Sequence, residues 1–253
     1  MKRLPAECVS HIISFTSPRD ACRSSPVSSV FRRAVDSDIV WEKFLPPDYK
    51  RIISSSSSLN SMSKKDLYFH LCTHPIIIGD GNMSFALEKQ SGKKCYMVGA
   101  RGLAIAWGDT PANWQWITPP HASRFSQVAE LKLVLGLDIK ANIETKNLSQ
   151  GTTYAAYLVY QLSQFKSGFG RSPIVLRINY RKSGVVSVHS VILDPMPPRA
   201  LHRGDGWMEI EMGCQFLIEQ GDDDDAVECR VTEGSNLKSG LIVEGIELRP
   251  KHI

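Results

Sequence analysis

The sequence predicts a multidomain α+β protein in which a small helical region precedes an antiparallel β-sandwich. Apolar residues recur at helical spacing up to about residue 75, and from Ile76 onward they alternate with a period of two. Gly, Pro, Asp and Ser turns separate the alternating segments at the close spacing typical of an antiparallel sandwich. No long helical pattern alternates with these strands, which argues against a parallel α/β sheet.

Four apolar stripes in the first 45 residues predict a compact helical unit. The first covers residues 4–15 and is opened by Pro5, and Ser17 can cap the second helix. The third covers residues 27–35, and a short fourth helix over 36–45 ends at two prolines. A unit of this size lies below the ~55 to 65 residues that usually fold alone, so we expect a partner to cover its surplus apolar surface.

A connecting segment is predicted between the two domains. Ser54–Ser58 is a run of five serines, which cannot build a core and predicts a flexible linker or, if the next helix packs against both domains, a surface loop. Ser63 and Asp66 form a capping box that starts this next helix, and Pro75 ends it. The predicted domains are residues 1–47, 48–75 and 76–253.

Eleven strands are predicted after the connecting helix. They are 76–78, 84–87, 95–98, 103–107, 130–139, 153–162, 173–180, 185–193, 207–212, 226–231 and 241–248.

The segment Leu103–Trp116, LAIAWGDTPANWQW, contains three of the five tryptophans. Its alternation predicts a strand that ends at Trp107, and Trp114 and Trp116 are two residues apart and so point the same way in an extended backbone. An indole offers a flat apolar face to a sugar ring or another planar ligand and an N–H to a polar neighbour. Core packing is the alternative, because Trp is also a large core residue. We favour Trp107 and Trp114 for binding and expect Trp116 to run into the core.

No catalytic or metal-binding motif is recognisable. The sequence has no GxSxG, P-loop, dinucleotide fingerprint or HExxH, and strand carboxylates such as Glu209 and Glu211 are interpreted as solvent-facing. The consecutive aspartates Asp222–Asp225 lack the alternate spacing of a calcium loop, and the six cysteines form no CxxC pair. We therefore predict no catalysis, no cofactor and no metal site.

Charge and apolar patterning argue against nucleic-acid-binding, secreted and membrane-spanning proteins. The net charge of +4, without a dense Lys/Arg block, gives no indication of a nucleic-acid partner. Glu7, Ser10 and His11 interrupt what would be the apolar core of a signal peptide, and no apolar run approaches the ~18 residues that span a bilayer. We expect no membrane association and a location in the cytoplasm and nucleus.

The N-terminal residues resemble the F-box. The matching pieces are LP at 4–5, II at 12–13, SPRDACR at 17–23, VSSVFRRAV at 27–35 and DSDIVWEKFLP at 36–46. In that family the motif docks on a Skp-type adaptor, which links it to a cullin-based ubiquitin ligase. Pro26 departs from the family pattern and is expected to start the third helix one turn late.

The F-box resemblance implies a set of adaptor-binding residues. They are Leu4, Pro5, Ile12, Ile13 and Trp41. For Ile13 and Trp41, packing among the helices is an equal alternative, whereas the family places Pro5 at the adaptor surface.

The rest of the chain resembles the phloem protein two lectins, also called the Nictaba type. The matching pieces are AIAWGDTPANWQWI, VAELKLVLGLDIKANIETKNLSQGTTYAAYLVYQL, DGWMEIEMG and KSGLIVEGIELRPK, in the order of that family. This resemblance implies a jelly-roll-like lectin that binds N-acetylglucosamine oligomers and N-glycan cores. It implies carbohydrate-binding residues in the tryptophan segment, namely Trp107 and Trp114, with Trp116 as a third candidate. Gly136 is a departure, because the founding lectin has a Trp before its LDI.

Together the two resemblances imply a function. An F-box followed by such a lectin is a known plant arrangement, and it implies a substrate-recognition subunit of an SCF-type ubiquitin ligase that binds glycans or glycoproteins. The alternative is an F-box receptor whose sandwich binds a non-glycosylated protein. The sequence leaves both open.

Overall fold

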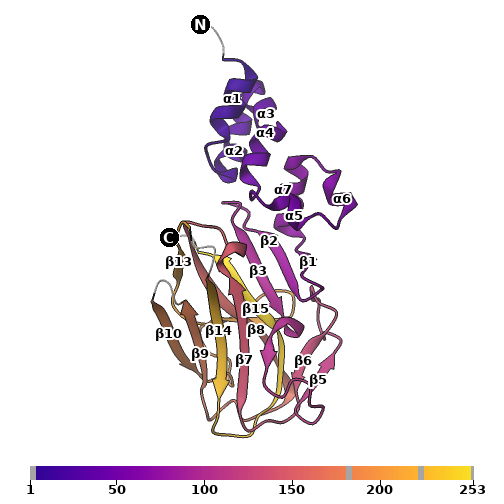
Figure 1. Cartoon of the computed structure of the whole chain (residues 1–253), viewed down its shortest axis with the longest axis vertical. Helices are drawn as coiled ribbons and strands as arrows, with labels where there is room; N and C mark the ends of the chain where they lie inside the picture. The colour runs from indigo at the N-terminus through magenta and orange to yellow at the C-terminus, as the bar shows by residue number, and fades with distance from the viewer. Residues whose placement is uncertain (1–3, 181–183, 222–224, 252–253) are drawn as a thin grey trace. The chain divides into compact units, whose positions relative to one another are not determined.

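The computed structural model describes residues 4–180, 184–221 and 225–251, and it divides into two compact units (Figure 1). One unit contains the chain up to Ile76 together with Phe85–Lys94, and the other contains Ile77–Ser84 and the chain from Cys95 onward. No helix of the described residues is long and apolar enough to cross a membrane.

The first unit is helical, as predicted. Its elements are α1 (Ala6–Ile13), α2 (Pro18–Ser24), a 3₁₀ turn η1 (Ser25–Val27), α3 (Ser29–Val35), α4 (Asp38–Phe44), α5 (Tyr49–Ile52), α6 (Ser57–Asn60) and α7 (Lys64–Thr73). The caps read from the sequence are present: the Ser17 and Ser63 hydroxyls accept hydrogen bonds from the backbone N–H groups of Asp20 and Asp66, both at 3.1 Å. Pro26 lies in η1, and α3 begins at Ser29, two residues after the start of the stripe predicted over 27–35.

The segment predicted as a connector packs within the helical unit. Trp41 of α4 lies 5.1 Å from Tyr68 and 5.0 Å from Phe69 of α7, measured between ring centroids. The Tyr68 hydroxyl donates to the backbone carbonyls of Glu88 and Lys89 at 3.3 and 3.1 Å. Burial raises the pKa of this phenol well above its usual value. The helix therefore completes the core of the first unit.

The serine run is folded rather than a flexible linker. Ser54 and Ser55 lie in a turn, and α6 begins at Ser57 with the Ser56 hydroxyl accepting from the backbone N–H of Leu59. The buried side chains of Ile53 and Leu59 on either side supply the apolar contacts that serine cannot. A capped helical turn between two buried residues explains the order.

The second unit is a β-sandwich, except that parts of its first three strands, namely Ile76, Phe85–Leu87 and Lys94, belong to the first unit. Its strands are β1 (Ile76–Ile78), β2 (Met83–Leu87), β3 (Lys94–Gly99), β4 (Ala104–Ile105), β5 (Trp114–Ile117), β6 (Val128–Leu131), β7 (Leu137–Glu144), β8 (Thr152–Ser167), β9 (Ile174–Tyr180), β10 (Val185–Val191), β11 (Ala200–His202), β12 (Met208–Glu211), β13 (Phe216–Ile218), β14 (Ala226–Glu233) and β15 (Ser239–Pro250). Two short 3₁₀ turns, η2 (Ala100–Gly102) and η3 (Thr145–Asn147), lie between strands.

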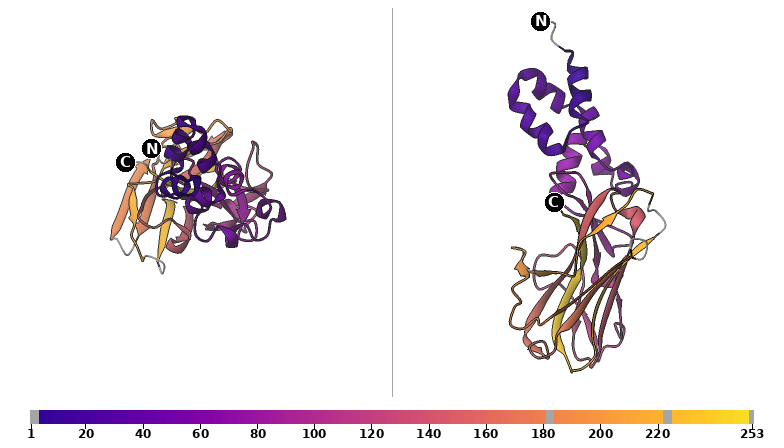
Figure 2. Two further views of the ribbon diagram at one scale, coloured as in Figure 1. Left: turned by 90° about the horizontal axis from the view of Figure 1, so that it is seen from above. Right: turned by 90° about the vertical axis from the view of Figure 1, so that its left-hand side faces the viewer.

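The strands form two sheets, and the long strands of both sheets are aligned roughly along one common axis (Figure 2). The larger sheet has the order β1-β2-β3-β15-β8-β12-β11, with β6 on β15, β5 on β6 and β13 on β8; the smaller has the order β10-β9-β14-β7-β4. The strand pairs β14–β7 and β15–β8 at their centres are antiparallel. The predicted fold class, a small helical region followed by an antiparallel β-sandwich, is confirmed.

Three strand predictions need correction. The segment predicted as one strand over 130–139 is two strands, β6 and β7, which belong to different sheets. Residues 132–136 connect them, and the pattern continued across the connection because Val134 is buried there and bridges to Lys238. The strand predicted over 103–107 is reduced to Ala104–Ile105. The short strands β5, β11 and β13 were not predicted.

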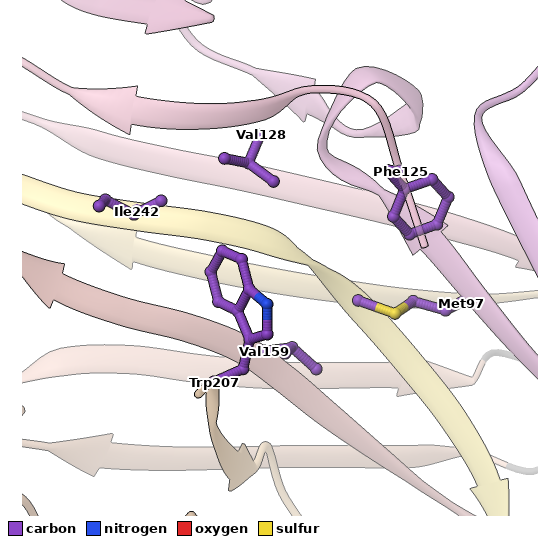
Figure 3. Packing of buried hydrophobic residues seen from close by; sticks show 6 residues of the cluster. All are labelled: Met97, Phe125, Val128, Val159, Trp207 and Ile242. Atoms are coloured by element: carbon purple, nitrogen blue, oxygen red, sulfur yellow. The ribbon is translucent and has the colours of Figure 1, made fainter. Parts of the chain in front are cut away.

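Both faces of the larger sheet are covered at its centre. Tyr154–Tyr160 of β8 are all buried, although alternate residues point to opposite faces. One face packs into the sandwich, where the Phe216 ring lies 6.4 Å from Tyr154 and 6.0 Å from Tyr180. On the other face a separate cluster forms between strands and loops: Met97, Phe125, Val128, Val159, Trp207 and Ile242 (Figure 3).

Candidate functional site

The tryptophan segment is held by its own indole N–H groups. Trp114 Nε1 donates to the carbonyl of Ala106 at 3.1 Å, and Trp116 Nε1 donates to the carbonyl of Gly108 at 3.2 Å. These two carbonyls belong to the residues immediately before and after Trp107. The expectation that Trp114 and Trp116 point the same way is confirmed, and together they fix the backbone on both sides of the third indole.

Trp107 itself is presented to solvent. Its side chain is 67% exposed, and its backbone φ is 62°. The left-handed region is unfavourable for a bulky residue and persists only where the surroundings enforce it. The backbone N–H of Thr110 donates to the Trp107 carbonyl at 2.9 Å and closes the turn. A costly conformation that exposes a large ring makes Trp107 a candidate binding position.

A polar groove of about 370 Å³ begins at the residue before Trp107. It is lined by Ala104, Ile105, Ala106, Asp138, Lys140 and Arg230. Arg230 donates from Nε to Asp138 Oδ1 at 2.7 Å and from Nη2 to Oδ2 at 2.5 Å. These hydrogen bonds from Arg230 hold the pKa of the Asp138 carboxyl below its usual value. The groove therefore presents an ionic pair, and its lining residue Ala106 directly precedes the exposed Trp107 in the chain.

The exposure expected for the other two tryptophans is wrong. Trp114, expected in the open loop, is 2% exposed, whereas Trp116, expected in the core, is half-buried. The Arg101 guanidinium covers the Trp116 ring at 3.8 Å from its centroid and is held by the Gln127 side-chain oxygen at 2.7 and 3.0 Å. Because Trp114 lies beneath the turn that it supports, only Trp107 has a free ring face.

The polar side of the groove was not predicted. Asp138 and Arg230 lie on β7 and β14 and are paired opposite Thr232 and Lys140, so they meet only through sheet register. No local sequence signal joins two residues that are 92 positions apart. Gly136 is exposed near the same corner, and a Cβ there would meet only the Glu233 carbonyl oxygen, at 3.8 Å.

A buried ionic network anchors the segment that follows β5. Arg124 and Arg203 each reach a carboxylate oxygen of Glu247 at 2.7 Å, and Ser123 donates to Glu244 at 2.7 Å. Burial alone raises the pKa of Glu247, but Arg124, Arg203 and Arg249 together hold that pKa below its usual value. The connection between β5 and β6 is thus fastened to the face of β15.

The predicted adaptor-binding residues separate into two groups. Leu4, Pro5 and Ile12 are exposed and are available to a partner. Trp41 is 0% exposed and lines no described groove, whereas Ile13 is 3% exposed and lines the apolar groove between α1 and α3. Trp41 donates from Nε1 to the Val35 carbonyl at 2.6 Å, as a core indole does.

An apolar groove of about 490 Å³ lies between α1 and α3. It is lined by Leu4, Val9, Ile12, Ile13, Ser28, Ser29, Val30 and Phe31. Three further apolar side chains of the helical unit are exposed: Phe15, Val27 and Ile39, at 76%, 67% and 57%. All three belong to the stripes read from the sequence, but a stripe does not reveal which of its members lie at the surface.

The described residues contain no group of three or more His, Cys, Asp and Glu side chains that could hold a metal ion. Asp222–Asp224, three of the consecutive aspartates whose spacing is unlike that of a calcium loop, lie outside the described residues.

Comparison with known proteins identifies both parts. A family model described as phloem protein 2 matches residues 93–250, and one described as F-box-like matches residues 1–47. Among proteins of Arabidopsis thaliana, the putative F-box protein PP2-B12 is 43% identical over 254 residues, which cover 99% of this chain and 98% of that protein. F-box protein VBF is 37% identical over 286 residues, covering 99% and 100%.

A solved structure is also similar at low identity. The native structure of a family 35 carbohydrate binding module from Clostridium thermocellum matches 61% of this chain and 96% of its own, with 13% identity and a TM-score of 0.36. The family assignment rests on the sequence matches, which extend over more than half of the chain for the phloem protein 2 model and over nearly the whole chain for the relatives. The chain therefore belongs to the phloem protein 2 family, among the plant F-box proteins that carry this domain.

Proposed function

We propose that the chain is a non-catalytic substrate-recognition subunit of an SCF-type ubiquitin ligase, active in the cytoplasm and nucleus, whose β unit binds glycans or glycoproteins. The observation that carries the glycan half is the exposed Trp107 ring, held by Trp114 and Trp116 beside the polar groove. The resemblance to the Nictaba type favours N-acetylglucosamine oligomers and N-glycan cores as ligands.

The chemistry of the site fits a sugar. The apolar face of a pyranose ring can stack on Trp107, and its hydroxyls can exchange hydrogen bonds with Asp138, Arg230 and Lys140. Because each hydroxyl must first lose its bonds to water, a stacking contact or a hydrogen bond adds only ~1 kcal/mol. About four to eight such contacts correspond to affinities of about millimolar to micromolar for one site.

Trp107→Ala tests this assignment. We expect at least a ~10-fold loss of affinity for N,N′,N″-triacetylchitotriose, measured by isothermal titration calorimetry on the full chain, with an unchanged melting temperature because the ring is 67% exposed. Phe165→Ala is the matched control, since Phe165 is an exposed ring of β8 outside the groove. Equal binding by Trp107→Ala and the control would remove the ring from the site and favour a receptor for non-glycosylated protein.

The adaptor half of the proposal rests on the helical unit. Leu4 and Ile12 are 60% and 56% exposed and line the apolar groove between α1 and α3. Exposed apolar surface of this extent on a small unit is a mark of a protein interface. The family pattern assigns that interface to a Skp-type adaptor.

Ile12→Asp tests the adaptor contact. A carboxylate in the interface would be desolvated without a partner, so we expect co-precipitation of a Skp-type adaptor to fall at least ~10-fold. Val186→Asp is the control, because Val186 is a comparably exposed residue of β10 in the other unit. Undiminished adaptor binding by Ile12→Asp would contradict this part of the proposal.

A further inference from the structure

A second groove lies at the edge of the five-stranded sheet opposite β4. It consists of two adjoining cavities of about 250 and 360 Å³. Both are lined by His189 of β10, by Pro198 and Arg199 before β11, and by Glu211 of β12. The groove thus lies where the edges of the two sheets face each other. It shares no lining residue with the polar groove of Asp138 and Arg230.

The smaller cavity is apolar at its floor. Leu176 and Ile210, each 1% exposed, and the half-buried Val191 line it together with two prolines. Its volume lies below the ~300–1,000 Å³ of pockets that enclose a drug-sized molecule. It is better matched to one apolar side chain that projects from a larger partner.

The charge at the groove is unevenly compensated. The Glu211 carboxylate is paired with Lys251 at 3.1 Å. Arg199 is exposed, and within the described parts of the chain its guanidinium has no ion pair or hydrogen bond. A guanidinium presents a planar fork that matches a carboxylate. The free positive charge beside an apolar cavity therefore selects a ligand that joins a carboxylate to an apolar group.

The strand beside the groove can pair with an extended backbone. Among the described strands, β10 pairs only with β9 and is the last strand of its sheet. Val186 and Val188 on its outer face are 60% and 48% exposed, and the strand carries no Lys, Glu, Asp or Pro. Such an edge lacks the usual protection against pairing and can accept a further strand.

We propose that this groove binds the C-terminal end of an extended peptide, with the last side chain, an apolar one, in the cavity, the terminal carboxylate on Arg199, and the preceding residues paired along β10. A peptide C-terminus supplies a carboxylate, an adjacent apolar side chain and a backbone in one ligand, and amidation of the terminus distinguishes it from an internal acidic residue. The proposal goes beyond glycan recognition, because it assigns a separate surface that binds the C-terminus of a substrate protein.

The test uses the full chain and fluorescein-labelled peptides of eight residues, with a Ser/Thr body and a last residue of Leu, Phe or Asp. Fluorescence anisotropy should show binding of the Leu or Phe peptide and at least a ~10-fold loss when its C-terminus is amidated, since the amide removes the negative charge that pairs with the guanidinium. Arg199→Glu should lose at least as much, and Arg199→Lys should retain part of the affinity.

Two controls make the test specific. Arg177→Glu, which changes an exposed arginine of β9 that lines neither cavity, should bind the peptides as the wild type does. Trp107→Ala should also bind them normally, so that failure of the glycan proposal and failure of this one are distinguishable. The inference is overturned if no peptide binds, if amidation has no effect, or if Arg199→Glu binds the peptides as Arg177→Glu does. It is also overturned if free 4-methylpentanoate has the same affinity as the whole peptide, because the peptide backbone would then contribute nothing.

Discussion

At the scale of single residues, the three tryptophans of one segment have different tasks. Trp107 is the exposed ring, while Trp114 and Trp116 use their N–H groups to hold the carbonyls on either side of it. The strained backbone of Trp107 is compensated by these bonds, because loss of either one would free the turn to relax. Trp114 and Trp116 are therefore positioning residues for the proposed sugar contact.

Trp114→Phe separates positioning from packing. It keeps a ring in the buried site but removes the donor to Ala106, which we expect to cost about 1–3 kcal/mol of unfolding free energy and to weaken triacetylchitotriose binding. Urea denaturation and calorimetry measure the two effects. Trp107→Phe is the companion variant, which should keep both stability and most of the binding. Full glycan affinity in Trp114→Phe would show that the turn needs no support from the indole.

At the scale of elements, the covered outer face of the larger sheet depends on charge as well as on apolar contact. Glu247 of β15 is 2% exposed and lies within 2.7 Å of both Arg124 and Arg203, which come from two different loops. Glu209 of β12, interpreted from the sequence as solvent-facing, is instead 7% exposed, and it accepts from Arg203 at 3.1 Å and from Arg249 at 2.6 Å. The carboxylates of β15 and β12 thus pair with the loop arginines Arg124 and Arg203. Without these carboxylates the arginines would be buried, unpaired charges.

Glu247→Gln should expose this dependence. At pH 7 we expect a cost of about 3–5 kcal/mol, because the arginines lose a buried carboxylate. The pKa of Glu247 is lowered in the folded state, so its contribution is present above the unfolded value of about 4.3 and is lost as pH falls through the lower folded value. The difference between the variant and the wild type should therefore shrink in acid.

Urea denaturation at pH 7 and at successive values below 4.3 measures this pH dependence. Glu144→Gln is the control, since its side chain is 57% exposed in an ion pair with Lys146, and a surface pair contributes only about 0–1 kcal/mol. A Glu247→Gln cost that stays constant across this range would rule out an ionised carboxylate in the folded state.

At the scale of the whole molecule, the helical unit is discontinuous in sequence. Phe85–Lys94 belongs to it although Ile77–Ser84 does not. Within this unit Lys94 pairs with Asp48 at 3.2 Å, and Gly92, at a φ of 71°, lies so close to the Phe44 carbonyl that a Cβ would stand 2.7 Å from that oxygen. The helices that line the apolar groove between α1 and α3 are therefore completed by a segment that follows them in the chain.

A fragment that ends at Lys94 should be more stable than one that ends at Ile76. The shorter fragment lacks the two carbonyls that accept from Tyr68 and the lysine that pairs with Asp48. We therefore expect the shorter fragment to lose about 1–3 kcal/mol of unfolding free energy. For units of this size, each kcal/mol lowers the melting temperature by roughly 4–8 °C. Circular dichroism melts of both fragments measure it. Equal melting temperatures would contradict the assignment of Phe85–Lys94 to this unit.

Much of the fold could be predicted because the evidence is local. Ser17 and Ser63 each cap a helix through a residue three positions later, so both helix starts can be predicted from a few residues. The apolar residues change from helical spacing to alternation at Ile76, where the strands begin. The burial of Trp114 could not be predicted, because spacing tells which side chains share a direction but not what covers that direction. The Asp138–Arg230 pair was equally hidden, since it exists only through the register of β7 and β14.

The discontinuity of the helical unit also limits how the protein can be divided and recombined. The chain passes between the two units at three places, after Ile76, Ser84 and Lys94. An exchange at the first of these would transplant the helices without Phe85–Lys94 and would leave that segment in the donor without its neighbours. Of these three places, a junction near residue 94, where the phloem protein 2 match has just begun, moves every residue of the helical unit together.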